Sequence, residues 1–172
     1  MTIAPIVEPP DATPASAPSR SRVVTVADDA ARQRLIDAYP EAALVSATLP
    51  LRANLDVLEN IAVVPRFRRN LDAETALQLA WYLLDAAGHA DCAHVRDPDL
   101  THEQRFVAKL LRAVIGDPPL ILIDRPAMLL PDSPYPVVVR SVLARLESRL
   151  TQCWIVDYAW NVPLYPPPES RT

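Results

Sequence analysis

The sequence is poor in glycine, lysine and cysteine, and each scarcity narrows what the protein can be. It has 2 glycines against 19 prolines in 172 residues. The glycines are Gly88 and Gly116, and Lys109 is the sole lysine. The 2 cysteines, Cys92 and Cys153, lack the close spacing that zinc sites need. We therefore expect reduced thiols, with neither a metal site nor a disulfide framework.

Long apolar runs and a strong charge imbalance are also missing. The apolar runs, such as 120–123, fall far short of the roughly 20 residues that a membrane-spanning helix needs. No charged region followed by an apolar block marks a secretory signal. A net charge of -4 argues against nucleic-acid binding. Because 50% of the residues are hydrophobic, we expect one packed cytoplasmic domain.

Proline-rich segments bound the expected domain at both ends. Residues 1–22 and 163–172 offer too little apolar surface to offset the cost of ordering them, so we expect disordered tails around a domain at 23–162. Apolar strands are expected at 23–26, 42–47, 120–123 and 153–156. Helices are expected at 28–38, 54–64, 72–87 and 101–116, and after Ser133. This pattern predicts a parallel α/β sheet with a helical subdomain inserted at about 54–116.

Two helices carry clear start and stop signals. Thr101 and Gln104 make a capping-box pattern, and Gly116 is placed to end that helix. Its apolar face is expected to be Phe106, Val107, Leu110, Leu111 and Val114, with Arg105, Lys109 and Arg112 on the opposite face. Asp72 can cap the preceding helix, which Gly88 would stop. Its inward face is expected to hold Leu77, Ala80, Trp81 and Leu84, and we expect Trp154 and Trp160 in or near the core as well.

Three motifs, covering about residues 42–160, resemble those of the ATP-binding-cassette (ABC) ATPases. The family's LSGGQ signature is matched by Leu100, Thr101, His102, Glu103 and Gln104. An apolar strand ending at Asp124 follows, as in the family's Walker B motif, and its distance from Gln104 matches without a gap. The segment from Asn54 to Ile61 is similar to the family's helix start after the Q-loop. The resemblance implies a reduced P-loop-NTPase-like sheet.

The residues that the family uses for ATP hydrolysis are replaced. ATP binding needs a G-x-x-x-x-G-K-[ST] loop before the Q-loop, yet no glycine precedes Gly88 and no lysine precedes Lys109. The stretch before residue 47 also leaves little room for the family's first lobe. Arg125 stands at the position of the catalytic glutamate and cannot accept a proton from water. Tyr158 stands at the switch histidine and Ala47 at the Q-loop glutamine. The resemblance thus implies a degenerate ATPase that needs no cofactor.

The altered signature also has simpler interpretations. His102 and Glu103 replace two glycines, and Glu103 is expected to act as a first-turn acid that stabilises the helix N-terminus. His102 shares no metal-ligand spacing with His89 or His94, so no metal is expected. We expect the carboxylate of Asp124 to pair with Arg125 or Arg105.

The surviving segments favour a non-catalytic accessory or regulatory subunit of an ABC transporter. Such a subunit would dock on a membrane permease or an intact ATPase, and would reach the membrane only through that partner. The expected contact residues are Asn54, Arg66, Phe67, Arg68 and Arg69. A solvated loop is the simpler interpretation of the arginines. Two alternatives stay open: a residual ATP-binding ABC ATPase, and a stand-alone interaction module. The Ala-, Arg- and Pro-rich composition points to a bacterial source.

Overall fold

Short apolar segments rich in β-branched residues form a four-stranded sheet. The computed structural model describes residues 20–165. Its strands are β1 (Ser21–Val26), β2 (Ala43–Val45), β3 (Ile121–Asp124) and β4 (Cys153–Tyr158). They lie in the order β1-β4-β3-β2, and every pairing is parallel. The central strands β3 and β4 are buried along most of their length, as expected for a parallel sheet that is covered on both faces, whereas the edge strand β1 is partly exposed.

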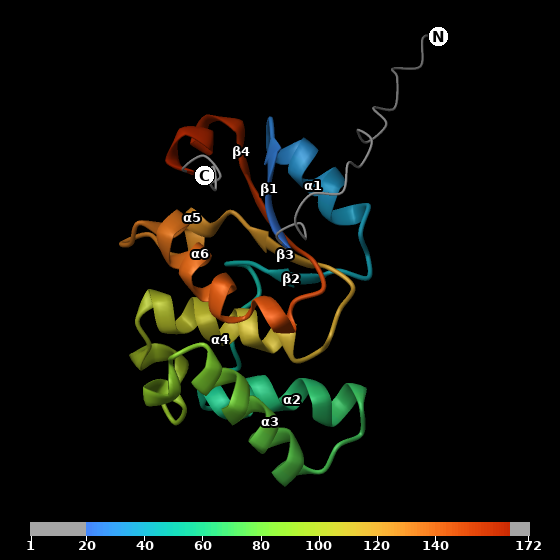
Figure 1. Ribbon diagram of the computed structural model, residues 1–172, viewed down its shortest axis with the longest axis vertical. Helices are drawn as coiled ribbons and strands as arrows, with labels where there is room; N and C mark the ends of the chain where they lie inside the picture. The colour runs from blue at the N-terminus through green and yellow to red at the C-terminus, as the bar shows by residue number, and fades with distance from the viewer. Residues whose placement is uncertain (1–19, 166–172) are drawn as a thin grey trace, which may run out of the picture.

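Alternate residues of the central strands pack against different layers. Leu122 and Val156 join a small cluster covered by Ala31 and Leu35 of α1 (Asp29–Asp37). Ile121 and Ile123 point to the other face and belong to the main core, which α4 and α6 complete. Figure 1 shows α1 on one side of the sheet and the short α5 (Pro126–Leu129) and α6 (Tyr135–Arg145) on the other.

The chain between β2 and β3 forms a block of helices that lies below the sheet (Figure 1). It consists of α2 (Val57–Arg68), α3 (Ala73–Ala86) and α4 (His102–Val114), with two 3-10 turns, η1 (Ala90–Cys92) and η2 (Asp97–Asp99), between α3 and α4. Two further 3-10 segments, η3 (Glu147–Arg149) and η4 (Ala159–Leu164), flank β4. Asp56, Asp72 and Thr101 cap the three helices, the first and last through capping boxes.

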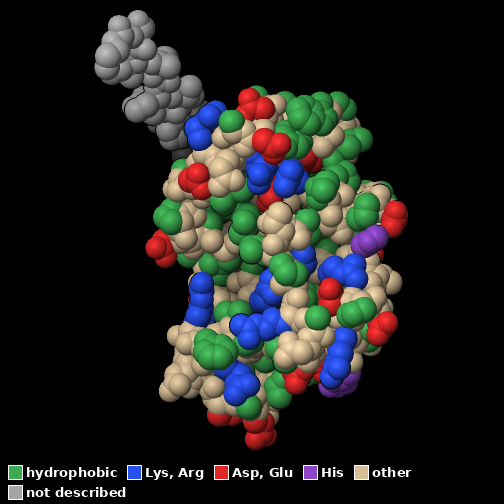
Figure 2. Space-filling view, turned by 180° about the vertical axis from the view of Figure 1, so that it is seen from behind, with side chains coloured by type: hydrophobic (Ala, Val, Ile, Leu, Met, Phe, Trp, Pro, Cys, Tyr) green, Lys and Arg blue, Asp and Glu red, His purple; other side chains and the backbone are tan. Residues whose placement is uncertain are grey.

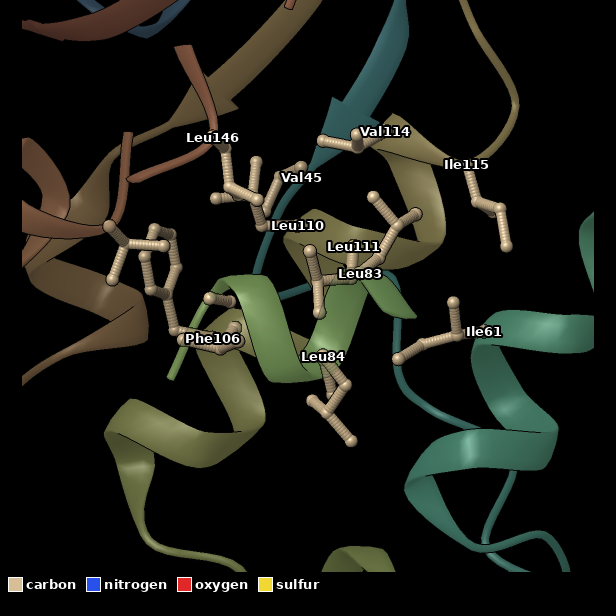
Figure 3. Close-up of a cluster of buried hydrophobic side chains, with 14 of the residues drawn as sticks. Val45, Ile61, Leu83, Leu84, Phe106, Leu110, Leu111, Val114, Ile115 and Leu146 are labelled. Atoms are coloured by element: carbon tan, nitrogen blue, oxygen red, sulfur yellow. The ribbon is translucent and has the colours of Figure 1, made fainter. Parts of the chain in front are cut away.

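Helix α4 joins the sheet to the helical block. Phe106, Leu110 and Leu111 are fully buried, and they meet Ile61 of α2 and Leu84 of α3 (Figure 3). Burying each such side chain contributes about 1.5–3 kcal/mol relative to leaving it in water. The apolar face predicted for α4 is therefore confirmed, as are its capping box and the left-handed Gly88 that follows α3.

The structure corrects several details. Helix α2 runs through Pro65 to Arg68, because the Pro65 ring is buried and its carbonyl accepts the Arg69 N–H at 3.0 Å. Helix α4 ends at Val114, and the left-handed residue after it is Asp117, not Gly116. Trp81 and Trp160 are 45% and 64% exposed, since the buried stripe of α3 is the narrower one through Ala76, Ala80, Leu83 and Leu84.

Both ends of the folded domain extend further than the sequence indicated. Ser21 and Arg22, placed in the expected N-terminal tail, belong to β1. Pro163 and Leu164, placed in the expected C-terminal tail, belong to η4, and the hydroxyl of Tyr165 binds Asp157. Residues 1–19 and 166–172, which hold the rest of the two expected tails, lie outside the described residues. Between residues 20 and 165, no helix combines the length and the apolar character that crossing a membrane requires.

Candidate functional site at the carboxyl edge of the sheet

The carboxyl ends of the four parallel strands meet at one edge of the sheet. In open α/β sheets, ligands bind outside this edge. Here the edge carries Asp28 after β1, Ser46 after β2, Asp124 and Arg125 at the end of β3, and Tyr158 at the end of β4. The fold thus brings together Asp124, Arg125 and Tyr158, three of the residues predicted from the sequence.

The junction between β1 and α1 is short and contains no glycine. Ala27 and Asp28 alone connect the strand to the helix. The Asp28 carboxylate accepts the N–H of Ala31 at 2.7 Å and so caps α1. The free N–H groups of a helix N-terminus attract anions. In this chain an aspartate side chain occupies that position.

Asp124 is a buried carboxylate with an incomplete set of partners. Its side chain is 2% exposed. One oxygen, Oδ2, accepts the Ser46 hydroxyl at 3.0 Å and Arg32 Nη1 at 3.1 Å. The other, Oδ1, lies 3.5 Å from Nε of Arg125, and neither atom has a hydrogen bond. Asp124 therefore pairs with Arg32 and Arg125, whereas Arg105, the other predicted partner, binds Asp97 at 2.7 Å.

A second carboxylate links the same arginines. Asp29 Oδ1 accepts the Tyr158 hydroxyl at 2.6 Å and Arg32 Nε at 3.1 Å, and Arg125 Nη1 lies 3.6 Å away. The Tyr158 hydrogen bond, followed by that from Arg32, lowers the pKa of Asp29. The same bond raises the pKa of Tyr158. Hydrogen bonds and charges of Asp29 and Asp124 raise the pKa of Arg32 despite its burial. Two acids and two arginines thus balance within one network.

Lys109 approaches this edge from α4. The sequence placed it on a solvated face, but it is 6% exposed and its Nζ donates to the Ser46 carbonyl at 3.0 Å. Burial, together with the nearby charge of Arg112, lowers its pKa. The loop after β2 covers the polar face of α4, and this explains the burial. Ala47, the Q-loop position, is exposed in that loop.

The signature segment forms the start of α4, away from the charge network. Leu100 is buried and Thr101 is the N-cap, with Gln104 closing the capping box. His102 Nδ1 lies 3.0 Å from Asp132, and Glu103 lies 3.6 Å from His89. A shallow hollow of about 470 Å³ is lined by Leu100, Thr101, His102, Glu103, Asp132 and Ser133. Glu103 is a first-turn acid, as expected. Among residues 20–165, no group of His, Cys, Asp and Glu could hold a metal ion.

The predicted partner contact is split between the two ends of α2. Asn54 is exposed just before the helix, and Arg66, Phe67 and Arg68 are exposed in its last turn, with Arg69 as the C-cap. Twelve helical residues separate these ends by about 18 Å. Phe67 is 79% exposed, an unusual position for a phenylalanine. A single partner touching both parts must run along α2.

Several organising residues were missed from the sequence. Buried Asn60 holds the loop before α2, because its amide donates to the carbonyls of Arg52, Leu55 and Asp56 and its oxygen accepts the Arg52 N–H. Arg32 follows the N-cap of α1 by four residues, where its charge opposes the helix dipole. A cation in such a position is a signal that an acidic partner lies close by.

Asp157 is another organiser that the sequence analysis overlooked. It is 1% exposed, at the end of an otherwise apolar strand. Oδ2 accepts the hydroxyls of Tyr165 at 2.7 Å and Tyr135 at 3.1 Å. Oδ1 accepts the Asn161 amide and the Tyr158 N–H, both at 2.8 Å. Burial and this carboxylate raise the pKa of Tyr135 to about 12 and also raise that of Tyr165. An acid inside an apolar strand was the available signal.

Comparison with known proteins gives matches among solved structures alone. No family model matches the chain, and no curated protein does. The ATP-binding cassette MJ0796, in a dimeric post-hydrolysis state with ADP and Pi, matches with a TM-score of 0.56 and 23% identity over 78% of this chain and 59% of that one. A second structure of MJ0796, a dimeric bacterial ABC transporter cassette, gives the same values.

An inward-facing metal-chelate type ABC transporter matches with a TM-score of 0.60 and 18% identity, over 80% of this chain and 62% of that one. The chain therefore spans about three fifths of the length of the chains it matches. At these identities the likeness concerns the fold. The predicted fold class is confirmed, and this chain has the α/β fold of the ATP-binding-cassette ATPases.

Proposed function

We propose that the protein is a non-catalytic, ABC-ATPase-like accessory or regulatory subunit that docks on a membrane permease or on an intact ABC ATPase. The observation that carries this proposal is the paired charge network at the carboxyl edge of the sheet. Two acids, Asp29 and Asp124, pair there with Arg32 and Arg125, so no surplus positive charge remains to hold a triphosphate.

The β1–α1 junction supports the same conclusion. A phosphate loop is an eight-residue, glycine-containing connection between a strand and a helix, whose backbone N–H groups cradle the phosphates. Ala27 and Asp28 replace such a connection in this chain, and the Asp28 carboxylate takes the Ala31 N–H. A phosphate at this helix end would meet negative charge from both Asp28 and Asp29. The described residues therefore do not fit magnesium-bound ATP.

Arg125 argues against hydrolysis at the same place. A guanidinium stays protonated at every physiological pH, so it cannot activate water as a general base. In this structure Arg125 pairs with Asp29 and Asp124, which is a structural use of the charge. Its backbone is left-handed, with φ of 47°, and the following α5 begins at Pro126.

The loop before α2 and the last turn of this helix are suited to docking on a partner. Asn60 fixes the loop that carries Asn54, and the last turn of α2 presents Phe67 between Arg66 and Arg68. The helical block is present between β2 and β3, contrary to what an accidental likeness to the cassette would predict. That presence favours the transporter role over a stand-alone interaction module.

Two measurements test the proposal. The first is calorimetric titration with magnesium-ATP, for which we expect no saturable heat. Micromolar binding would instead support the alternative of a residual ATP-binding ABC ATPase. The second is purification of the tagged protein from its native host in mild detergent, followed by identification of what co-purifies. We expect an ABC permease or an intact ABC ATPase, and recovery of neither would overturn the docking role.

A matched pair of variants locates the contact. Arg66→Glu with Arg68→Glu reverses two exposed charges on α2, whereas Arg34→Glu with Arg140→Glu makes the same change in charge on α1 and α6. We expect the first pair to abolish co-purification and the second to preserve it. Equal recovery with both pairs would show that the end of α2 is not the contact.

A further inference from the structure

A pocket lies in the helical block, apart from the charge network. Its volume is about 300 Å³, and it is walled by α3, the C-terminal ends of α2 and α4, and the 3-10 turn η3. Small-molecule sites begin at roughly this size and extend to about 1,000 Å³. The pocket is therefore suited to one or two side chains of a partner rather than to a nucleotide.

The floor of the pocket is apolar. Leu83, Val114 and Ile115 contribute to it while remaining only 5–7% exposed. Leu79 and Tyr82 form part of the rim and are 37% and 55% exposed. An apolar side chain that entered here would cover Leu79 and the Tyr82 ring, and removing this apolar surface from water would favour binding.

The rim of the pocket is positively charged. The Arg149 guanidinium lies 4.7 Å from the centre of the Tyr82 ring, and Arg69 Nη2 lies 3.9 Å from the exposed carboxylate of Asp117. Such a long, exposed ion pair contributes little to stability, so Arg69 remains available to a carboxylate of a partner.

This local excess stands against the net charge of -4 of the whole chain. Figure 2, which views the molecule from behind, shows Lys and Arg side chains over the lower half of that face, with several Asp and Glu side chains among them. Two guanidiniums and one carboxylate line the pocket itself. The pocket thus combines two arginines, Arg69 and Arg149, that can bind carboxylates with an apolar floor that can accept an apolar side chain.

We propose that this pocket binds an acidic peptide segment of a partner protein, with a leucine or phenylalanine inserted between Tyr82 and Leu83 and flanking carboxylates on Arg69 and Arg149. This inference deepens the proposed docking function, and the identity of the partner rests on that function. The chemistry of the pocket rests on its own residues, so the two can fail separately.

The test uses fluorescence anisotropy with the full chain and a labelled peptide, acetyl-Glu-Asp-Leu-Phe-Glu-Asp-amide. We expect saturable binding that weakens with salt. Replacing the Leu-Phe pair of the peptide by Ser-Ser should weaken binding at least about 10-fold, the equivalent of 1.4 kcal/mol. Arg69→Glu and Arg149→Glu should each weaken it by a similar factor. The control Arg34→Glu, which changes an exposed arginine on α1, should leave the affinity within about 2-fold.

A second measurement does not depend on any variant folding. In ¹⁵N-labelled wild-type protein, the peptide should shift the backbone amide signals of Leu79, Tyr82 and Arg149 and leave those of α1 unchanged. The proposal is overturned if binding is absent, if the Ser-Ser peptide binds equally well, or if Arg34→Glu weakens binding as much as Arg69→Glu. If an ABC subunit co-purifies but the peptide does not bind, the peptide-binding pocket is refuted and the transporter role stands. If the peptide binds but no ABC subunit co-purifies, the transporter role is refuted and the pocket stands.

Discussion

The four hydrogen bonds converging on Asp157 make the sharpest quantitative prediction. Tyr165→Phe keeps the ring, and with it the edge-to-face contact with Tyr135, but removes a 2.7 Å hydrogen bond to a buried carboxylate. Hydrogen bonds to charged groups contribute about 1.5–3 kcal/mol, so we expect a loss of about 2 kcal/mol in the free energy of unfolding. Tyr135→Phe removes a longer bond of 3.1 Å, and we expect a loss of about 1 kcal/mol.

The two tyrosines share one oxygen, so their effects should not add. When both are replaced, Oδ2 of Asp157 loses both of its hydroxyl donors inside the protein. We expect the double variant to lose about 1 kcal/mol more than the sum of the single losses. Urea unfolding followed by circular dichroism gives these differences by linear extrapolation. Tyr82→Phe is the control, since this tyrosine is 55% exposed and its ring contact with Arg149 survives.

The same pair gives a pH dependence with a definite sign. Burial, followed by the charge of Asp157, raises the pKa of Tyr135 from 10.0 to about 12, and the pKa of Tyr165 is raised too. The unfolded chain therefore ionises first as the pH rises. The stability that these hydroxyls contribute is present below pH 10 and is lost as the pH approaches and passes 12. The difference in unfolding free energy between wild type and the double variant should narrow across this interval.

Two results would refute this reasoning. One is a Tyr165→Phe protein as stable as the Tyr82→Phe control, which would mean that the hydroxyl of Tyr165 contributes nothing to holding η4 against β4. The other is an unchanged difference between wild type and double variant from pH 9 to 12. That outcome would place the alkaline loss of stability in other groups.

Three further predictions follow from single sites. Arg32→Ala removes one of the two arginine partners of the buried Asp124 carboxylate and should cost about 3 kcal/mol in urea unfolding, whereas Arg34→Ala should cost under about 0.5 kcal/mol. Cys92 and Cys153 are fully buried, and burial raises their pKa to about 11 and about 12. Neither thiol should therefore react with Ellman's reagent at pH 8 until guanidinium unfolds the chain. Fast labelling of the folded protein would contradict this prediction. Gly88→Ala forces an alanine into a left-handed backbone conformation and displaces the Arg145 guanidinium. The thermal midpoint of this variant should therefore fall by the equivalent of about 1–2 kcal/mol, whereas that of Gly116→Ala should change little. Equal losses in the two variants would be evidence against the backbone explanation.

The sequence predicted the helices and strands of this fold better than it predicted the contacts of the buried polar side chains. Strands and helices follow from local patterns, which is why the sheet and the face of α4 were correctly placed. Of the two arginines that pair with Asp124, Arg125 was predicted, but Arg32 was not, because it lies 92 positions away in the chain and no local pattern links the two. Lys109 shows the same limit: periodicity identified the polar face of α4, but the loop that covers this face comes from residues after β2. Pro65 predicts a helix end because a proline restricts the local backbone, but its ring packs against distant parts of the chain, and α2 continues through it.

The position of β1 has a consequence for how the molecule is assembled. Ser21 pairs with Cys153, so about 130 residues separate the two partners of this parallel ladder. On a ribosome, which makes roughly 5–20 residues per second, β1 and α1 would wait several seconds before β4 exists to receive them. The helical block can fold within that interval, because α2, α3 and α4 contact one another locally. Among the strands at residues 20–165, β4 is the latest to be synthesised, and its place in the sheet lies between β1 and β3, which are already present. Chains that stall before residue 153 should expose the apolar edge of β3 and attract chaperones.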